Sequence, residues 1–85
     1  MIRICRLGKT RMSLRGHANS ADYGQDLVCA AASALAMTLG ENLKQMEQPE
    51  ICLRSGDTEL SCVSTLEAEQ VFDCIWKGFQ LLAEI

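Results

Sequence analysis

Two pairs of short segments show the alternation of apolar and polar residues that is typical of β-strands. In residues 2–7 isoleucines alternate with arginine and cysteine, and after a Gly-Lys-Thr turn residues 11–17 alternate again. Residues 50–55 and 58–63 are shorter strand candidates, joined by a Ser-Gly-Asp turn. The pattern therefore predicts two β-hairpins.

The first predicted hairpin leads through a loop into a helical segment. Residues 18–24 are small and polar with no period, whereas the alanine-rich stretch Gln25–Leu39 consists largely of strong helix formers. This stretch is apolar on nearly all sides, which predicts a central, buried helix. Gly40 is expected to end the helix, and residues 41–49 are expected to form a polar connection.

The second predicted hairpin is followed by an amphipathic helix that runs to the C-terminus. Ser64 and Glu67 match the capping box, in which a serine side chain and a glutamate three residues later bind the first free amides of a helix. Phe72 and Trp76 are expected to flank the apolar stripe of this helix. The stripe consists of large apolar residues: Leu66, Val71, Ile75, Phe79 and Leu82.

The order of elements, ββαββα, predicts an α+β fold in which a four-stranded antiparallel sheet packs with two helices. The chain of 85 residues is expected to form a single domain, 1–85, because a chain of this length buries roughly 60–65% of its unfolded surface around one core. No apolar run reaches the roughly 18 residues of a membrane span. The N-terminus also lacks the features of a signal peptide, so we expect a cytoplasmic protein without membrane contact.

Charge is distributed unevenly along a chain whose net charge is −3. The negative charge argues against a general nucleic-acid binder, and no direct DNA binding is expected. Residues 1–16 nevertheless hold five basic side chains and no acid. This segment is either a solvated face of the sheet or an electropositive surface for an acidic partner or RNA. The basic residues are Arg3, Arg6, Lys9, Arg11 and Arg15.

The cysteines point to free thiols and away from a disulfide framework or a zinc site. Five cysteines are an odd number, and no two form a Cys-x-x-Cys pair. The chain has one histidine, so closely spaced thiolate and imidazole ligands for zinc are lacking. We therefore expect neither a metal nor a cofactor. The cysteines are Cys5, Cys29, Cys52, Cys62 and Cys74.

Two residues supply candidate chemistry. His17 closes a predicted strand, and Cys29 lies within about the first turn of a predicted helix, where unpaired amides and the helix dipole favour a thiolate over a thiol. An imidazole beside a thiol can take its proton and later give it to a leaving amine. The seven-residue loop is long enough to bring the strand end and the helix start together. The same amides could bind an oxyanion.

Both residues, and the nearby candidates Asp26 and Ser33, also have purely structural interpretations. Cys29 could be a small buried residue of an alanine-rich helix, and His17 a hydrogen-bonded surface residue. Asp26 could favour the helix start through its charge rather than orient a histidine. Ser33 could bind a helix carbonyl. The residue pattern alone leaves these alternatives open.

Residues 16–35 resemble the signature of a known family, the ribosomal-processing cysteine protease Prp family, also called YsxB-like. The matching residues are Gly-His-Ala, a short loop, and then Tyr-Gly-x-Asp-Leu-Val-Cys-Ala-Ala-x-Ser-Ala-Leu. Neither piece would be specific alone, but their joint occurrence is. The ββαββα order extends the resemblance across most of the chain.

The resemblance implies a bacterial cytoplasmic endopeptidase with a Cys-His dyad, in which Cys29 is the nucleophile and His17 the general base. Its implied substrate is the large-subunit ribosomal protein numbered twenty-seven, from which the family removes an N-terminal extension. A homodimer, a transient contact with the ribosome and a lid over residues 18–24 are further expectations. Candidates for substrate binding lie in the same motifs: Gly16, Ala18, Tyr23, Gly24, Asp26 and Ser33.

Two alternatives come from other functional classes. The chain could be a non-catalytic, ribosome-associated binding protein that uses the basic N-terminal hairpin as its contact surface. It could also be a redox-sensing protein in which Cys29 is oxidised. The presence of both His17 and Cys29 favours the peptidase, and the lack of an obvious resolving cysteine disfavours the redox sensor.

Overall fold

The computed structural model describes residues 2–16, 23–54 and 56–83, with the side chains of the first helix described from Leu27 onward. The elements follow the predicted ββαββα order, and the strand bounds differ by one or two residues from those that the alternation suggested. The elements are β1 (Arg3–Arg6), β2 (Arg11–Arg15), α1 (Tyr23–Leu43), β3 (Glu50–Arg54), β4 (Asp57–Ser61) and α2 (Leu66–Ala83).

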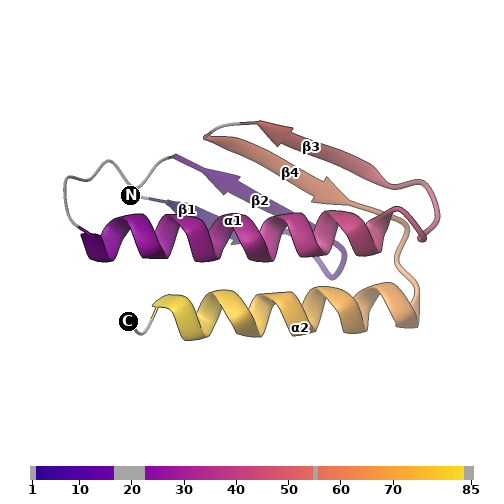
Figure 1. Cartoon of the computed structure of the whole chain (residues 1–85). Helices are drawn as coiled ribbons and strands as arrows, with labels where there is room; N and C mark the ends of the chain where they lie inside the picture. Colours follow the sequence, from indigo (N-terminus) through magenta and orange to yellow (C-terminus); the bar gives the residue numbers. More distant parts are fainter. Residues whose placement is uncertain (1, 17–22, 55, 84–85) are drawn as a thin grey trace.

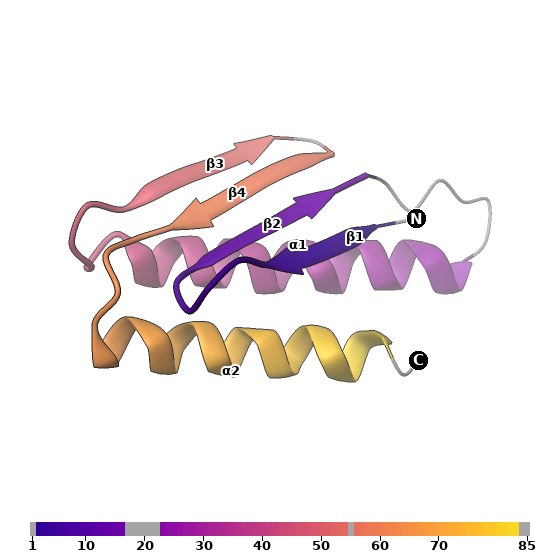
Figure 2. The same ribbon diagram turned by 180° about the vertical axis from the view of Figure 1, so that it is seen from behind.

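The four strands form one layer and the two helices form the other (Figures 1 and 2). The strand order is β1-β2-β4-β3, and every neighbouring pair is antiparallel. The two hairpins therefore meet through the β2–β4 ladder in the middle of the sheet. The predicted α+β fold with a four-stranded antiparallel sheet is confirmed.

Alternate strand residues point toward the helices and form the core. Met12 and Leu60 of the central strands are fully buried in one cluster with Leu39, Leu43 and Phe72 of the helices. Burial of side chains of this size contributes about 1.5–3 kcal/mol each. Two rows of residues cross the sheet on this face: Arg6, Met12, Leu60 and Ile51, and next to them Ile4, Leu14, Thr58 and Leu53.

Helix α1 is longer and less enclosed than the sequence predicted. It continues to Leu43, so Gly40 lies inside the helix and the prediction that Gly40 ends it is wrong. Gly40 is buried against the sheet, where packing outweighs its low helix propensity. Leu27 and Met37 are 54% and 60% exposed, so the expected central, buried helix is also wrong. The sheet and α2 cover α1 on one side only.

Helix α2 begins one residue later than the expected capping box implied. The Thr65 Oγ1 accepts a hydrogen bond from the Ala68 amide at 3.1 Å, so Thr65 caps the helix rather than Ser64. Phe72, expected to flank the stripe, is fully buried, whereas Leu66 is 73% exposed. The small side chain of Ala68 concealed the true stripe in the sequence. Its members are Ala68, Phe72, Ile75 and Phe79.

Much of the basic N-terminal hairpin is paired with acids from later in the chain. The Arg6 guanidinium, whose side chain is 16% exposed, lies 2.7 Å from the Asp73 carboxylate of α2. Lys9 lies 3.2 Å from Glu69, one turn earlier on the same helix. Arg15 pairs with β4, as described below. These contacts favour a solvated face of the sheet over an electropositive surface for a partner, because they neutralise part of its charge.

Within the described part of the chain, no helix has both the length and the apolar character that crossing a membrane requires.

Two glycines inside helices make a matched test of this packing. A Cβ on Gly40 would lie 3.6–3.7 Å from Ile51, Leu53 and Leu60, which is ordinary contact. A Cβ on Gly78 would lie 2.8 Å from Leu35 of α1. We expect Gly40→Ala to stabilise the fold by about 0.5–1 kcal/mol, through helix propensity. We expect Gly78→Ala to destabilise it by about 1 kcal/mol net, because overpacking outweighs that gain.

Urea unfolding of both variants measures the difference. A Gly78→Ala variant more stable than Gly40→Ala would show that the two helices are not as closely packed at Leu35 as described.

Candidate active site

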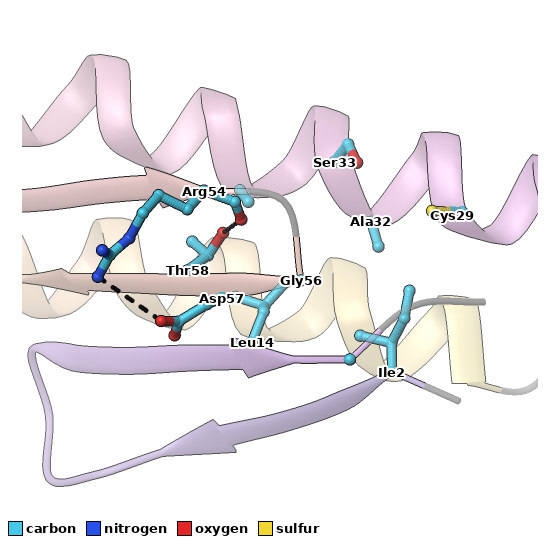
Figure 3. A pocket seen from close by; sticks show the side chains of 11 residues that line it. Ile2, Leu14, Cys29, Ala32, Ser33, Arg54, Gly56, Asp57 and Thr58 are labelled. Carbon is cyan, nitrogen blue, oxygen red and sulfur yellow. Dashed lines mark hydrogen bonds and ion pairs between the residues drawn. The ribbon is translucent and has the colours of Figure 1, made fainter. Parts of the chain in front are cut away.

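A cavity of about 150 Å³ lies between the N-terminal half of α1 and the sheet (Figure 3). Cys29 and Ser33 of α1 line one side of it, and Gly56 and Asp57 from the β3–β4 hairpin line the other. The full lining is Ile2, Leu14, Gly16, Cys29, Ala32, Ser33, Ala36, Arg54, Gly56, Asp57 and Thr58.

The cavity exists because the sheet-facing side chains of α1 change size along the helix. Leu39 and Leu43 fill the space next to the sheet at the C-terminal end. One and two turns earlier, Ala36 and Ala32 are buried as well, but an alanine reaches only as far as its Cβ. Protein interiors are otherwise close-packed, so a space left by small side chains stays open only where it reaches the surface.

The structure brings together three of the predicted site residues. Gly16, Cys29 and Ser33 line the same cavity, although Gly16 belongs to the chain after β2 and the other two to α1. Both His17 and Ala18 lie outside the described residues, as do the side chains of three more candidates. Those three are Tyr23, Gly24 and Asp26, whose backbone belongs to α1. The predicted loop over 18–24 therefore ends earlier than expected.

Cys29 lies two residues deeper in α1 than the sequence suggested. The helix begins at Tyr23, so Cys29 is its seventh residue. Only the first four amides of a helix lack an intrahelical acceptor. The prediction that such amides surround Cys29 is therefore wrong, and the dipole effect weakens beyond the first turn. The helix start therefore does not explain a reactive thiol at this position.

The end of β2 is attached to the β3–β4 turn at the cavity. The Gly16 amide donates a hydrogen bond to the Gly56 carbonyl at 3.0 Å. Both glycines have positive φ angles, 96° and 74°, which other residues rarely adopt. The end of β2 is thus held at Gly16, the last described residue before His17.

A second cavity, of about 210 Å³, continues the first along α1. Ser33, Ala36, Arg54 and Thr58 line both, so the two form one groove. Beyond these shared residues the groove reaches the exposed side chains of Met37 and Leu53.

The sequence reasoning missed the residues that the β3–β4 hairpin contributes to the cavity. Arg54, Gly56, Asp57 and Thr58 are all from this hairpin, which the sequence predicted as a structural element without a role at the site. No local signal marks them. They reach Cys29 because β4 pairs with β2, and this pairing places the turn of the second hairpin beside the end of the first.

None of the other four cysteines lines this cavity. Cys5 and Cys74 are exposed, and Cys52 is partly buried. Burial raises the pKa of the Cys62 thiol above its ordinary value. Its backbone is also fixed, because the Cys62 carbonyl accepts a hydrogen bond from Thr10 Oγ1 at 3.0 Å. Among the described residues, no three histidine, cysteine or acidic side chains are grouped so as to hold a metal ion.

The raised pKa predicts that Cys62 reacts slowly with iodoacetamide. The thiolate is the reactive form, and a raised pKa lowers its fraction at pH 8. We expect Cys62 to be labelled more slowly than the exposed Cys74 in the folded protein, with the difference narrowing as the pH rises and disappearing in urea. Peptide mapping after timed labelling measures both rates. Equal rates in the folded protein at pH 8 would contradict this environment.

Comparisons with known proteins bear on this site directly. The family description of cysteine protease Prp matches residues 2–84. No curated protein matches the chain. Prp from S. aureus, solved in complex with a covalently linked product peptide, is 27% identical with a TM-score of 0.78, over 99% of this chain and 90% of that one.

Two further solved structures are similar. The same S. aureus protease in complex with a substrate peptide is 25% identical with a TM-score of 0.75, over 98% of this chain and 87% of that one. A protein from Streptococcus mutans is 28% identical with a TM-score of 0.69, over 88% of this chain and 73% of that one. The family description matches nearly all residues, and the fold is that of the solved S. aureus protease. The chain therefore belongs to the cysteine protease Prp family.

Proposed function

We propose that the chain is an endopeptidase in which Cys29 is the nucleophile and His17 the general base. One observation carries the proposal: Gly16, which directly precedes His17, lines the same cavity as Cys29. The Gly16 amide is also hydrogen-bonded to the Gly56 carbonyl of the cavity wall at 3.0 Å, which supports a base supplied from this end of β2. His17 is also the one histidine of the chain, so it is the one imidazole available as a base.

The chemistry then takes two steps. In the first, His17 takes the Cys29 proton, the Sγ attacks the scissile carbonyl carbon, and the protonated imidazole gives its proton to the leaving amine. In the second, water attacks the thioester, the histidine takes a proton from it, and the C–S bond breaks to release the acid and the thiol. The S. aureus relative with a covalently linked product peptide supports an enzyme of this class.

The proposed substrate is the N-terminal extension of the large-subunit ribosomal protein numbered twenty-seven. The resemblance implies this protein, and the groove along α1 supports an extended segment rather than a folded domain as the bound form. The S. aureus relative is described as a ribosomal processing protease bound to substrate and product peptides. A bacterial cytoplasmic location, a homodimer and a transient ribosome contact complete the proposal.

The non-catalytic binding function has less support. It requires the basic N-terminal hairpin to be available to a partner, yet three of its five basic residues are paired within the chain: Arg6, Lys9 and Arg15.

Cleavage of the extension peptide tests the dyad. We expect Cys29→Ala to abolish cleavage and His17→Ala to lower the rate roughly 10²–10⁴-fold, the usual contribution of a positioned acid–base group. Cys74→Ser, which removes an exposed thiol of α2, is the matched control and should keep the rate. Mass spectrometry of a synthetic peptide from the same genome's ribosomal protein measures the products.

A folded His17→Ala variant with a near-normal rate would remove His17 from the mechanism. Cleavage by Cys29→Ala would remove the nucleophile.

A further inference from the structure

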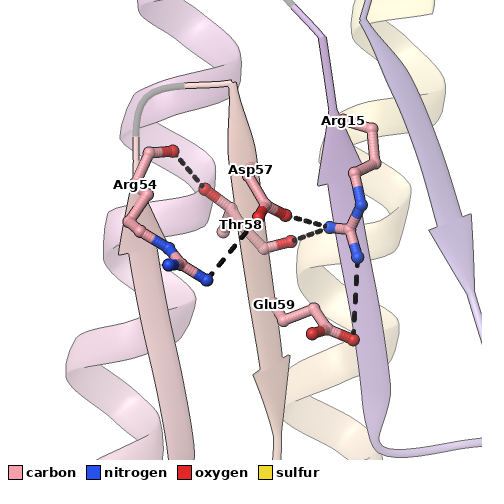
Figure 4. A network of polar contacts seen from close by, with 5 residues as sticks. All are labelled: Arg15, Arg54, Asp57, Thr58 and Glu59. Carbon is pink, nitrogen blue, oxygen red and sulfur yellow. Dashed lines mark hydrogen bonds and ion pairs between the residues drawn. The ribbon is translucent and has the colours of Figure 1, made fainter.

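An acidic side chain lies between two arginines at the edge of the cavity (Figure 4). The Asp57 Oδ1 lies 2.7 Å from Arg15 Nη1, and its Oδ2 lies 3.6 Å from Arg54 Nη2. Each carboxylate oxygen thus has its own guanidinium. Arg15 also donates to the Thr58 carbonyl at 3.3 Å and lies 3.9 Å from Glu59.

The pairing of strands explains why these residues meet. Asp57 is opposite Arg15 in the β2–β4 ladder and opposite Arg54 in the β3–β4 ladder, and both pairs are the last of their ladders. Asp57 therefore joins three strands at the point where the sheet ends. Directly beyond it lies the hydrogen bond from Gly16 to Gly56.

We propose that Arg15 and Asp57 are positioning residues, which hold the end of β2 and the β3–β4 turn together as the cavity wall opposite Cys29. The inference rests on the proposed function and deepens it. In a cysteine peptidase the base must stay within hydrogen-bonding distance of the thiol, and misplacement by about 1 Å can cost roughly 10²-fold in rate. The Arg15–Asp57 pair is the last described side-chain contact before the chain reaches His17.

The pair is not explained by global stability. Both side chains are 47% exposed, and ion pairs this exposed stabilise a fold little. The strands would pair without it through their backbone ladder and the apolar row on the other face. What the pair changes is local: it limits how far the strand end can separate from the turn.

The test has an arm that does not depend on catalysis. The Gly16 amide reports on the wall, because its hydrogen bond to Gly56 breaks when the strand end separates. We expect Asp57→Asn and Arg15→Met to speed hydrogen exchange at this amide about ten-fold. Lys9→Met, which removes an ion pair at the other end of the β1–β2 hairpin, should leave it unchanged. Unchanged exchange in Asp57→Asn would overturn the proposal whether or not the chain cleaves peptides.

The kinetic arm asks whether this wall serves the reaction. In an active enzyme we expect each variant to lower kcat about ten-fold, with KM changing less than about three-fold, and Arg15→Lys to recover part of kcat. The loss of kcat in the double variant should be smaller than the two single losses combined, because both substitutions remove the Arg15–Asp57 contact. The kcat and KM of Lys9→Met should equal those of the parent chain.

Additive losses, or kcat values equal to that of Lys9→Met, would overturn the positioning role. A parent chain that fails to cleave, with Gly16 exchange responding as expected, would instead contradict the proposed function alone.

Discussion

The contact of α1 with the sheet sets the geometry of everything else in the molecule. Large side chains hold the C-terminal half of the helix against the central strands, and Gly40 is buried there against Ile51 and Leu60. The N-terminal half faces the same sheet with Ala32 and Ala36. Because the helix is rigid, the packing of its C-terminal half also sets the distance between its N-terminal half and the sheet. The small residues of the N-terminal half therefore leave a space next to the sheet. The candidate nucleophile lies at that space.

Electrostatics organise the other face and the edges of the sheet. The basic hairpin and the acidic second half of the chain look like opposed regions in the sequence, but folding interleaves them. Arg6 reaches α2 from a row of otherwise uncharged residues, and Arg15 reaches β4 across the opposite face of the sheet. The ion pairs therefore connect the first hairpin to α2 and to β4, and they pair three of its five basic side chains within the chain.

The sequence predicted the elements well and their environments less well. Alternation and helix propensity are local, so both hairpins and both helices could be identified. Gly40 and Phe72 were misjudged because their roles depend on which element packs beside them, and Thr65 displaced Ser64 as the cap by a shift of one residue. At the site, Cys29 and Gly16 came from a motif. Asp57 could not, because it joins them only through the β2–β4 pairing.

The approach of Gly78 to Leu35 has a consequence for how this chain can change during evolution. A Cβ on residue 78 would lie 2.8 Å from Leu35 Cδ2, so the leucine side chain would have to shift to admit it. A side chain at position 78 is therefore accommodated best when residue 35 is smaller. Related chains should therefore vary these positions in concert, a larger residue at 78 accompanying a smaller one at 35. The two helices would then keep their spacing, and with it the width of the groove, while their sequences diverge.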